Sequence, residues 1–236
     1  MSPGVRMVER PSPNRDARPP GQAIDILLIH YTGMPSAAAA LARLCDPASR
    51  VSGHYCIDED GTIHRLVAEA ERAWHAGVAM WRGATDINAR SIGIELVNPG
   101  HEFGYRPFPE AQMRALTDLA RAILARHPMP PARVLGHSDV APLRKEDPGE
   151  LFDWPRLAAA GIGLWPDPGA QSETTEATEA TVRARLAAIG YGYVDQDFAA
   201  VVRAFQRHYR PEAVTGRVDA ETAARLESLY RQLAES

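Results

Sequence analysis

The chain has 236 residues, which is enough for one medium domain and one small domain. Hydrophobic residues make up 45% of the sequence and charged residues 24%, a composition typical of an ordinary globular protein. The net charge of −4 gives no electrostatic reason to expect nucleic acid or an anionic membrane as a partner, and no apolar run approaches the ~20 residues that a transmembrane helix needs.

The first residues are rich in proline and arginine and have no apolar periodicity, so we predict a flexible N-terminal arm over residues 1–23. They also lack the apolar core of about 7–15 residues that a secretory signal contains, and no lipidation signal is visible. On this observation we expect a cytoplasmic protein.

A buried strand and a helix follow. Residues 24–30 are nearly all apolar, which is the pattern of a strand buried on both faces, and the run ends on His30. Ser36 is a suitable N-cap for the alanine-rich helix that is predicted to run to Leu44.

A hairpin is predicted next, because the strand-like residues 51–58 and 62–67 are separated by turn residues. Cys56 lies in the first strand, where we expect a small buried hydrophobic residue. Cys56 and Cys45 are too few for a disulfide scaffold, and neither belongs to a CxxC pair that could ligate zinc. The sequence leaves open whether the two cysteines are bridged.

Residues 71–90 lack periodicity but contain Trp74, His75, Trp81 and Arg82. Aromatic residues gathered in a loop beside a sheet edge favour the wall of a ligand site. The alternative is that both tryptophans simply pack on the sheet.

The residues 91–97 predict another buried strand, with Glu95 in its middle. A carboxylate in such a run is costly unless it is paired, hydrogen-bonded or near a metal, and the alternative is that it faces solvent from an edge strand. An amphipathic helix is predicted from Pro109 to His127, and a last strand over residues 134–137. The alternation of strands and helices predicts an α/β domain with a mixed central sheet flanked by helices, over residues 24–165.

The composition changes sharply after this domain. Residues 166–180 read as a solvated linker, and residues 181–236 as a small all-α domain of three helices. The first of these helices is expected to end at Gly190 and the second to start near Asp195. The third is expected to start at Asp219, with Leu226 and Tyr230 facing inward.

A polar loop, residues 136–149, contains His137, Lys145 and Asp147. A catalytic zinc site needs three protein ligands and an open position. The loop can supply two of these ligands, His137 and Asp147, and His30 is the obvious third. Histidines that end two neighbouring strands come together at one edge of a sheet, although a histidine and an aspartate in a loop are more often solvated.

Six segments now resemble the zinc-dependent N-acetylmuramoyl-L-alanine amidases of the AmpD/AmiD type, the type-2 amidase family, which is related to the peptidoglycan recognition proteins. They occur in the family's order over about residues 24–165, and the resemblance is closest to the AmiD branch. The segments are Leu28-Ile-His-Tyr-Thr32, Ser52-Gly-His-Tyr55, Ala73-Trp-His-Ala-Gly77, Trp81-Arg-Gly-Ala-Thr85, Ser91-Ile-Gly-Ile-Glu-Leu96 and the loop 136–149.

The resemblance implies one Zn²⁺ ion per chain, held by His30, His137 and Asp147. It implies that Glu95 is the general base beside the metal and that Lys145 shares the negative charge of the tetrahedral intermediate.

The family segment that matches Trp74-His-Ala-Gly77 lines the substrate groove, so His75 is assigned to substrate binding. Trp74 and Arg82, in the same aromatic loop, are assigned to substrate binding as well. His54 is interpreted as a core residue or a neighbour of the site. The remaining histidines are interpreted as surface or packing residues: His64, His101, His127 and His208.

The expected activity is hydrolysis of the amide between N-acetylmuramic acid and L-alanine, and the expected partner is peptidoglycan or a muropeptide fragment. No protein partner can be inferred. The alternative is a non-catalytic recognition protein of the same fold, although such relatives typically lose a metal ligand and this chain keeps all three. A zinc peptidase of another fold is disfavoured because the sequence has no His-Glu-x-x-His helix.

The last domain resembles the three-helix peptidoglycan-binding type in Ala204-Phe-Gln206 and Gly216-x-Val-Asp219. We expect it to hold polymeric wall and to be dispensable for bond cleavage. The alternative is a helical appendage that only packs on the first domain. A wall-binding domain argues for the periplasm, which is the alternative to the cytoplasm.

Overall fold

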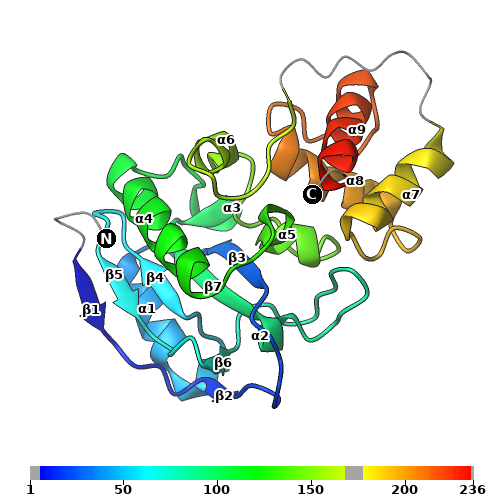
Figure 1. Cartoon of the computed structure of the whole chain (residues 1–236). Coiled ribbons are helices and arrows are strands. Elements are labelled where there is room, and N and C mark those ends of the chain that lie inside the picture. The colour runs from blue at the N-terminus through cyan, green and yellow to red at the C-terminus, as the bar shows by residue number, and fades with distance from the viewer. Residues whose placement is uncertain (1–5, 168–177, 235–236) are drawn as a thin grey trace.

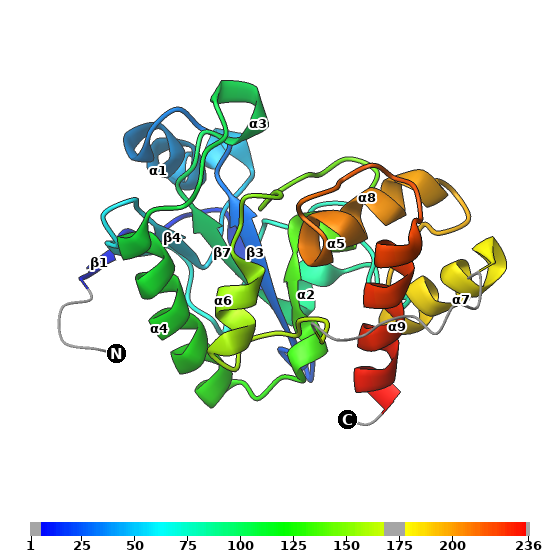
Figure 2. The same ribbon diagram turned by 90° about the horizontal axis from the view of Figure 1, so that it is seen from above.

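The computed structural model describes residues 6–167 and 178–234. A sheet with helices on both sides forms the first domain, and three helices form the second, which lies against it (Figures 1 and 2). In the described ranges, no helix combines the length and the apolar character that crossing a membrane requires.

A six-stranded mixed sheet forms the centre of the first domain, as predicted, with the order β1-β5-β4-β7-β3-β8. The pair β4–β5 is antiparallel, and every other neighbouring pair in this sheet is parallel. The strands are β1 (Met7–Glu9), β3 (Ile26–Tyr31), β4 (Tyr55–Ile57), β5 (Ile63–Arg65), β7 (Ser91–Leu96) and β8 (Val134–Gly136).

The predicted flexible arm is wrong for the described residues 6–23, whereas residues 1–5 lie outside the described ranges. Strand β1 adds to the main sheet beside β5, and β2 (Arg15–Ala17) forms a small antiparallel sheet with β6 (Glu71–Ala73). Arg18 then donates to the carbonyls of Asn88 and Ser91 at 3.1 and 2.8 Å. Three-residue strands are too short to show a period of two, so only their tertiary pairing reveals them.

Alternation along β3 assigns the two faces of the sheet to different partners. Leu27 and Ile29 pack in the core under helix α4 (Glu110–Arg126), whereas Ile26 and Leu28 share a core with the C-terminal helices. Figure 2 shows the sheet between these layers. His30 follows the same alternation, so it lies on the face away from α4.

The remaining helices of this domain are short apart from α1. The side chain of Ser36 accepts from the Ala39 amide at 3.2 Å, as expected for the N-cap of α1. The helices are α1 (Ala37–Cys45), α2 (Ile87–Arg90), α3 (Gly100–Phe103), α5 (His137–Val140) and α6 (Trp154–Ala159), with 3-10 turns at Pro47–Ser49 and Pro131–Arg133. Cys45 and Cys56 are both free thiols.

The C-terminal domain consists of α7 (Glu179–Ile189), α8 (Phe198–Tyr209) and α9 (Ala220–Ala234). Its inner side chains do not form a separate core, because Val201 and Phe205 belong to the same cluster of buried residues as Ile26 and Leu28. Tyr230 was predicted to face inward but is 39% exposed.

The neighbouring Leu229 takes the buried place in α9, and the Arg185 guanidinium lies 5.5 Å from the Tyr230 ring instead. Most of the predicted linker, residues 168–177, lies outside the described ranges. Of its described part, the Asp167 amide donates to Ser228 Oγ on α9 at 2.9 Å, and α7 already begins at Glu179.

Candidate metal centre

Parallel pairing of β3 with β8 brings two histidines to the same edge of the sheet. His30 is the fifth residue of β3, and His137 directly follows β8 as the first residue of α5. Asp147 lies further along the same loop. All three side chains are buried, and their ligand atoms lie within 4.8 Å of one another.

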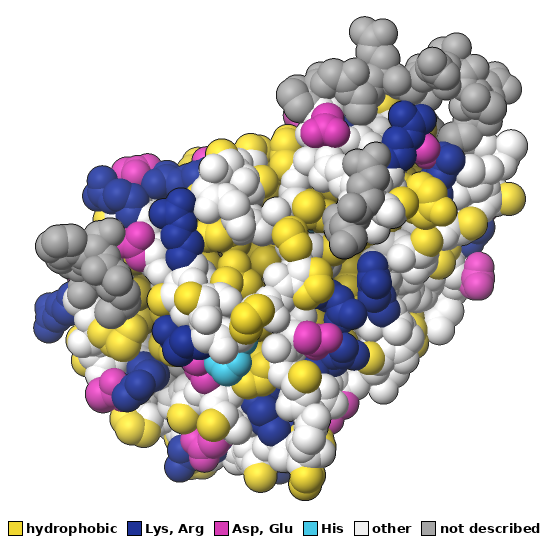
Figure 3. Space-filling view, in the orientation of Figure 1, with side chains coloured by type: hydrophobic (Ala, Val, Ile, Leu, Met, Phe, Trp, Pro, Cys, Tyr) yellow, Lys and Arg dark blue, Asp and Glu magenta, His cyan; other side chains and the backbone are white. Residues whose placement is uncertain are grey.

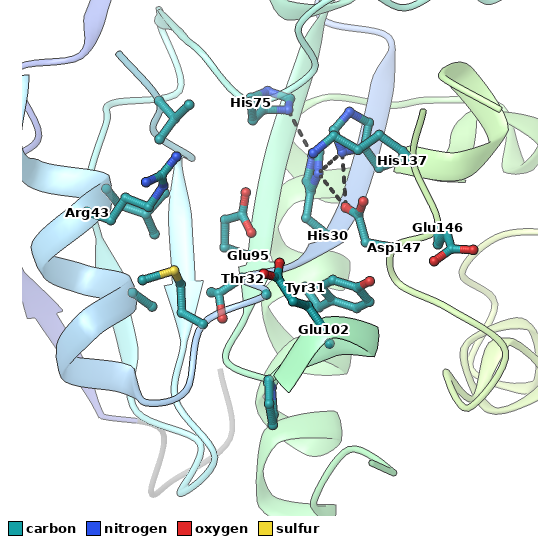
Figure 4. A pocket seen from close by; sticks show the side chains of 18 of the residues that line it. His30, Tyr31, Thr32, Arg43, His75, Glu95, Glu102, His137, Glu146 and Asp147 are labelled. Carbon is teal, nitrogen blue, oxygen red and sulfur yellow. Dashed lines mark hydrogen bonds and ion pairs between the residues drawn. The ribbon is translucent and has the colours of Figure 1, made fainter. Parts of the chain in front are cut away.

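The three side chains converge on one point, as Figure 4 shows. His30 Nδ1 lies 2.9 Å from His137 Nδ1, and Asp147 Oδ2 lies 3.1 and 3.0 Å from these two nitrogens. Two imidazoles and one carboxylate are a ligand set of the catalytic zinc sites of proteins. Among the described residues this is the one group of histidine, cysteine and acidic side chains that could hold a metal.

Two contacts bear on the tautomer of His137. Its Nε2 lies 3.0 Å from the Ala76 carbonyl oxygen, which can only accept, and 3.3 Å from Arg144 Nη2, which can only donate. The shorter contact favours a ring proton on Nε2, which leaves the Nδ1 lone pair free for a metal.

His30 is held in the same way through a chain of donors. Ser91 Oγ donates to the Ile87 carbonyl at 2.6 Å, so it accepts from His75 Nε2, which lies 3.3 Å away. His75 Nδ1 is then the acceptor for His30 Nε2, at 3.0 Å. This leaves the His30 Nδ1 lone pair, like that of His137, facing Asp147.

Charge and burial shift the pKa values in the expected directions. Burial and then the neighbouring His137 lower the pKa of His30 to about 4, so its neutral form is favoured. Burial opposes ionisation of Asp147, but a positive charge on the neighbouring His137 favours it, and the pKa of this carboxyl lies well below the usual range. A neutral imidazole and an ionised carboxylate are the forms that bind metal.

Glu95 lies on the central strand β7, directly opposite His30 in the parallel register, so the edge-strand alternative is wrong. Its side chain lines the same pocket as the three ligands and is 8% exposed. Burial, followed by the charge of Asp147, raises the pKa of Glu95 well above its ordinary value, and Lys145 acts in the opposite direction. A carboxylate with a raised proton affinity suits proton transfer.

The pocket has a volume of about 600 Å³ and includes three more of the predicted residues. Lys145 and Trp74 line it, and so does His75, which also bonds His30. Gly93 makes room for His75, because a Cβ there would lie 2.5 Å from the imidazole ring.

Arg82 was predicted to bind substrate, and the structure places it elsewhere. It is absent from the pocket lining, and its Nε donates to the Ile189 carbonyl of α7 at 3.1 Å. Trp81 packs at 5.0 Å from the Tyr191 ring and is buried, so packing, not a ligand wall, is its role. Both residues belong to the contact between the domains, which the local sequence pattern could not indicate.

Sequence reasoning missed a residue at the pocket rim. His101 lines the pocket, where its Nδ1 lies 2.9 Å from the Tyr31 hydroxyl and its ring stacks on Tyr105 at 4.4 Å. In the sequence, the one signal for the contacts among Tyr31, His101 and Tyr105 is that Tyr31 directly follows the ligand His30.

A buried His–His–Asp set with a glutamate beside it, at the carboxyl edge of a mixed sheet, is an arrangement that metal-dependent hydrolases use. The comparisons with known proteins agree. The profile of the family described as N-acetylmuramoyl-L-alanine amidase matches residues 20–150, and that of a putative peptidoglycan binding domain matches residues 176–226.

The N-acetylmuramoyl-L-alanine amidase AmiD of Escherichia coli is 39% identical, over 96% of this chain and 91% of its own length. The 1,6-anhydro-N-acetylmuramyl-L-alanine amidase AmpD of Haemophilus influenzae is 36% identical, over 63% of this chain and 89% of its own length. This chain belongs to the N-acetylmuramoyl-L-alanine amidase family.

Solved structures match over both domains. E. coli AmiD in complex with the substrate anhydro-N-acetylmuramic acid-L-Ala-D-γ-Glu-L-Lys superposes with a TM-score of 0.80 at 38% identity, over 93% of this chain and 94% of that chain. AmpDh3 of Pseudomonas aeruginosa in complex with an anhydromuramic pentapeptide superposes with a TM-score of 0.82 at 37% identity, over 93% of this chain and 96% of that chain. The mixed sheet and the appended helices are therefore the fold of these amidases.

Proposed function

We propose that this chain uses one zinc ion to hydrolyse the amide bond between N-acetylmuramic acid and L-alanine in peptidoglycan or its turnover fragments. The observation that carries the proposal is the buried set of His30, His137 and Asp147, which lines a pocket together with Glu95. Family membership supplies the type of bond.

The donor set fits zinc. His30 and His137 would hold the ion through Nδ1 and Asp147 through Oδ2, since both ring protons are engaged on the far side of the rings. Two neutral imidazoles and one carboxylate leave a net charge of +1 on the loaded site. Zinc bound there would polarise a carbonyl group and lower the pKa of a water molecule to about 7.

Glu95 is assigned as the general base. It takes a proton from the attacking water as the new C–O bond forms, and returns it to the amide nitrogen as the C–N bond breaks, so that L-alanine leaves as an amine. Its place opposite His30 on the neighbouring strand keeps the carboxylate beside the metal ligands, and its burial favours holding the transferred proton.

Lys145 is assigned to the negative charge that develops on the former carbonyl oxygen. Lys145 lines the pocket, and its charge acts on the pKa of both Glu95 and His30. A preplaced cation stabilises such an oxyanion more strongly in a partly dehydrated pocket than in water.

Trp74 is assigned to substrate binding. It lines the pocket, and the Arg50 guanidinium lies 5.8 Å from its ring centre. A pocket of about 600 Å³ has room for a sugar with several peptide residues, the kind of ligand bound to the AmiD and AmpDh3 structures. The C-terminal domain would hold polymeric wall, as the profile it matches suggests. The cytoplasmic location stays a prediction, which fractionation of cells that make the natural protein tests.

Products identify the activity. The zinc-loaded chain is incubated with a soluble anhydromuropeptide and separately with intact sacculi, and the released material is identified by mass. We expect free peptide with an N-terminal L-alanine, and Glu95→Gln is the matched control, with zinc bound but little product. A zinc-loaded protein that binds muropeptide tightly and releases no peptide would instead support the recognition-protein alternative.

A further inference from the structure

A completely buried carboxylate, Asp139, joins the two domains. Its Oδ1 accepts from the Tyr191 hydroxyl at 2.7 Å, and its Oδ2 accepts from His208 Nδ1 and from the Gly136 amide, both at 2.7 Å. Tyr191 and His208 belong to the C-terminal domain, whereas Gly136 and Asp139 belong to the amidase domain.

A buried carboxylate is costly unless hydrogen bonds replace its water. The amidase domain itself supplies only one of the three donors to Asp139, the Gly136 amide, and the C-terminal domain supplies the other two. The oxygens of Asp139 therefore have fixed directions only when the C-terminal helices are docked.

Asp139 sits in the short turn that carries a metal ligand. Helix α5 begins with His137, and the bond from the Gly136 amide to the Asp139 side chain closes the first turn of this helix. The Ser138 amide donates to the Asp147 carbonyl at 2.9 Å, so the same turn also ties down the loop of another ligand. A rotation of the Asp139 side chain would break its bond to the amide of Gly136, the residue directly before His137.

A second contact of helix α8 reaches the other ligand. Arg207, the neighbour of His208, donates to Glu146 Oε1 at 2.6 Å, and Glu146 directly precedes Asp147. The side chain of Glu146 is half exposed, so this ion pair alone stabilises little. The ion pair nevertheless acts on the same centre as the Asp139 contact. Two adjacent residues of α8 contact the segments that supply His137 and Asp147.

Aromatic packing keeps the Asp139 contact dry and fixed. The His208 ring lies between Trp154 and Tyr209, with ring centres at 3.7 and 3.8 Å and nearly parallel planes. Tyr191 packs against Trp81 at 5.0 Å. The His208 donor is therefore held in direction by a ring on either side, and the Tyr191 ring is held by its contact with Trp81.

We propose that Tyr191 and His208 are positioning residues for the metal ligand His137, on which they act through Asp139. The C-terminal domain then completes the metal centre, in addition to any hold on polymeric wall. This inference rests on the proposed function, because it concerns the affinity of the proposed zinc site.

Paired variants of the full chain separate the hydrogen bond from the packing. His208→Phe keeps a stacked ring and removes the donor, whereas His208→Asn places an amide donor near the position of Nδ1 and removes the ring. Tyr191→Phe removes a single oxygen, so it stays informative even where His208→Phe does not fold. Tyr209→Phe is the matched control, since its hydroxyl is not a donor to Asp139.

The readout is the zinc dissociation constant of the folded protein, measured by competition with a chromogenic chelator, with circular dichroism as the check of folding. Partners that orient a metal ligand are typically worth 10–100-fold in metal affinity, and we expect the lower end, about 10-fold, for Tyr191→Phe/His208→Phe. Each single variant should lose less, His208→Asn should bind zinc more tightly than His208→Phe, and Tyr209→Phe should bind like the parent.

The outcomes separate the two claims. If the parent binds zinc and the folded Tyr191→Phe and His208→Phe proteins bind it equally well, with only their unfolding temperatures lowered, the residues serve packing alone and the inference is overturned. The same holds if His208→Asn loses as much zinc affinity as His208→Phe. A parent that binds no zinc would overturn the proposed function and this inference with it.

Discussion

Two buried carboxylates of one loop, Asp139 and Asp147, have opposite surroundings. Asp139 is surrounded by groups that donate hydrogen bonds to it: the Gly136 amide, the Tyr191 hydroxyl and His208 Nδ1. All of its charge is therefore balanced by hydrogen bonds of the protein itself. Such a group stabilises one arrangement of the backbone through donors that the protein itself supplies.

Asp147 lies beside the Nδ1 atoms of two imidazole rings whose protons are on the other ring nitrogen. The Nε2 of His137 faces the Ala76 carbonyl, and the Nε2 of His30 faces His75. Three lone-pair groups that converge at about 3 Å repel one another unless a cation lies among them. The comparison shows that the protons of the neighbours, and not burial, distinguish a metal ligand from a structural carboxylate.

The largest effect is expected from Asp147→Ala, which removes the one anionic ligand. We expect it to bind no zinc at stoichiometric metal and to hydrolyse no muropeptide above background, because two neutral imidazoles cannot complete the site. Metal analysis after gel filtration measures the bound zinc.

Asp139→Asn is the counterpart on the same loop. It should still take up one zinc at saturating metal, with weaker affinity and a lower unfolding temperature. If Asp147→Ala kept full zinc occupancy, or if Asp139→Asn lost zinc altogether, the two carboxylates would not divide the roles of ligand and support in this way.

Glu95→Gln is expected to lower kcat by roughly 10²–10⁴-fold, the usual worth of general acid–base assistance. The amide keeps the size of the side chain and some of its hydrogen bonding but cannot take up the proton, so zinc content and KM should change little. Steady-state kinetics on a soluble muropeptide, with zinc measured on the same sample, test this. Parent-like kcat would show that another group takes the proton.

Lys145→Ala should lower kcat by about 10²–10³-fold, as the loss of a single oxyanion donor does. Lys145→Arg, which keeps the charge in a different shape, should recover part of this loss. A fall confined to KM would place Lys145 in substrate binding instead of charge stabilisation.

The sequence predicted the parts of this site that periodicity controls. Buried strands that lead to His30 and His137 become parallel neighbours in the sheet. The place of Glu95 opposite His30 was implied by the family resemblance and not by the local pattern. The mixed sheet flanked by helices followed from the same patterns and is confirmed by the match to AmiD. Local patterns were sufficient here because buried parallel strands are continuous apolar runs.

Contacts between the domains could not be predicted in this way. Arg82 looked like a substrate residue because it lies in an aromatic loop, and only the docking of α7 shows its partner, Ile189. Tyr191 and Asp139 are 52 residues apart, and His208 was interpreted only as a surface or packing residue. Polar residues buried between domains have no periodic signal, since their partners are defined by tertiary packing alone.

A smaller effect is expected from His75→Ala, because His75 touches the metal ligand and not the metal. The variant leaves the Nε2 proton of His30 without its acceptor, so we expect zinc affinity to fall by about 10–100-fold. Trp74→Phe is a matched control in the neighbouring position, which lines the pocket without a hydrogen bond to His30, and its zinc affinity should stay that of the parent. Equal affinities in the two variants would contradict the role given to His75.

An effect on stability, and not on the metal centre, is expected from His54, and it separates a satisfied buried group from a ligand by its response to pH. Like Asp139, His54 has both of its polar atoms engaged within the protein, here by the backbone. Its Nδ1 accepts from the Gly93 amide at 3.0 Å, and its Nε2 donates to the Glu71 carbonyl at 3.1 Å. Burial, followed by the charge of Arg18, lowers the pKa of His54 in the folded protein to about 3. In the unfolded chain the pKa of His54 is about 6.5, so the unfolded chain binds the proton first as the pH falls.

The free energy of unfolding should therefore decrease as the pH falls below about 6.5, and His54 should contribute a slope approaching 1.4 kcal/mol per pH unit until the folded pKa near 3 is reached. In His54→Gln this part of the slope is absent, so its curve should be flatter between about pH 6 and pH 4. Urea unfolding of both proteins at each pH measures the free energy of unfolding. Both proteins are first freed of metal, so that the zinc ligands contribute equally to the two curves. Parallel curves would show that the folded protein accommodates the proton on His54 and that this histidine is not held neutral by its surroundings.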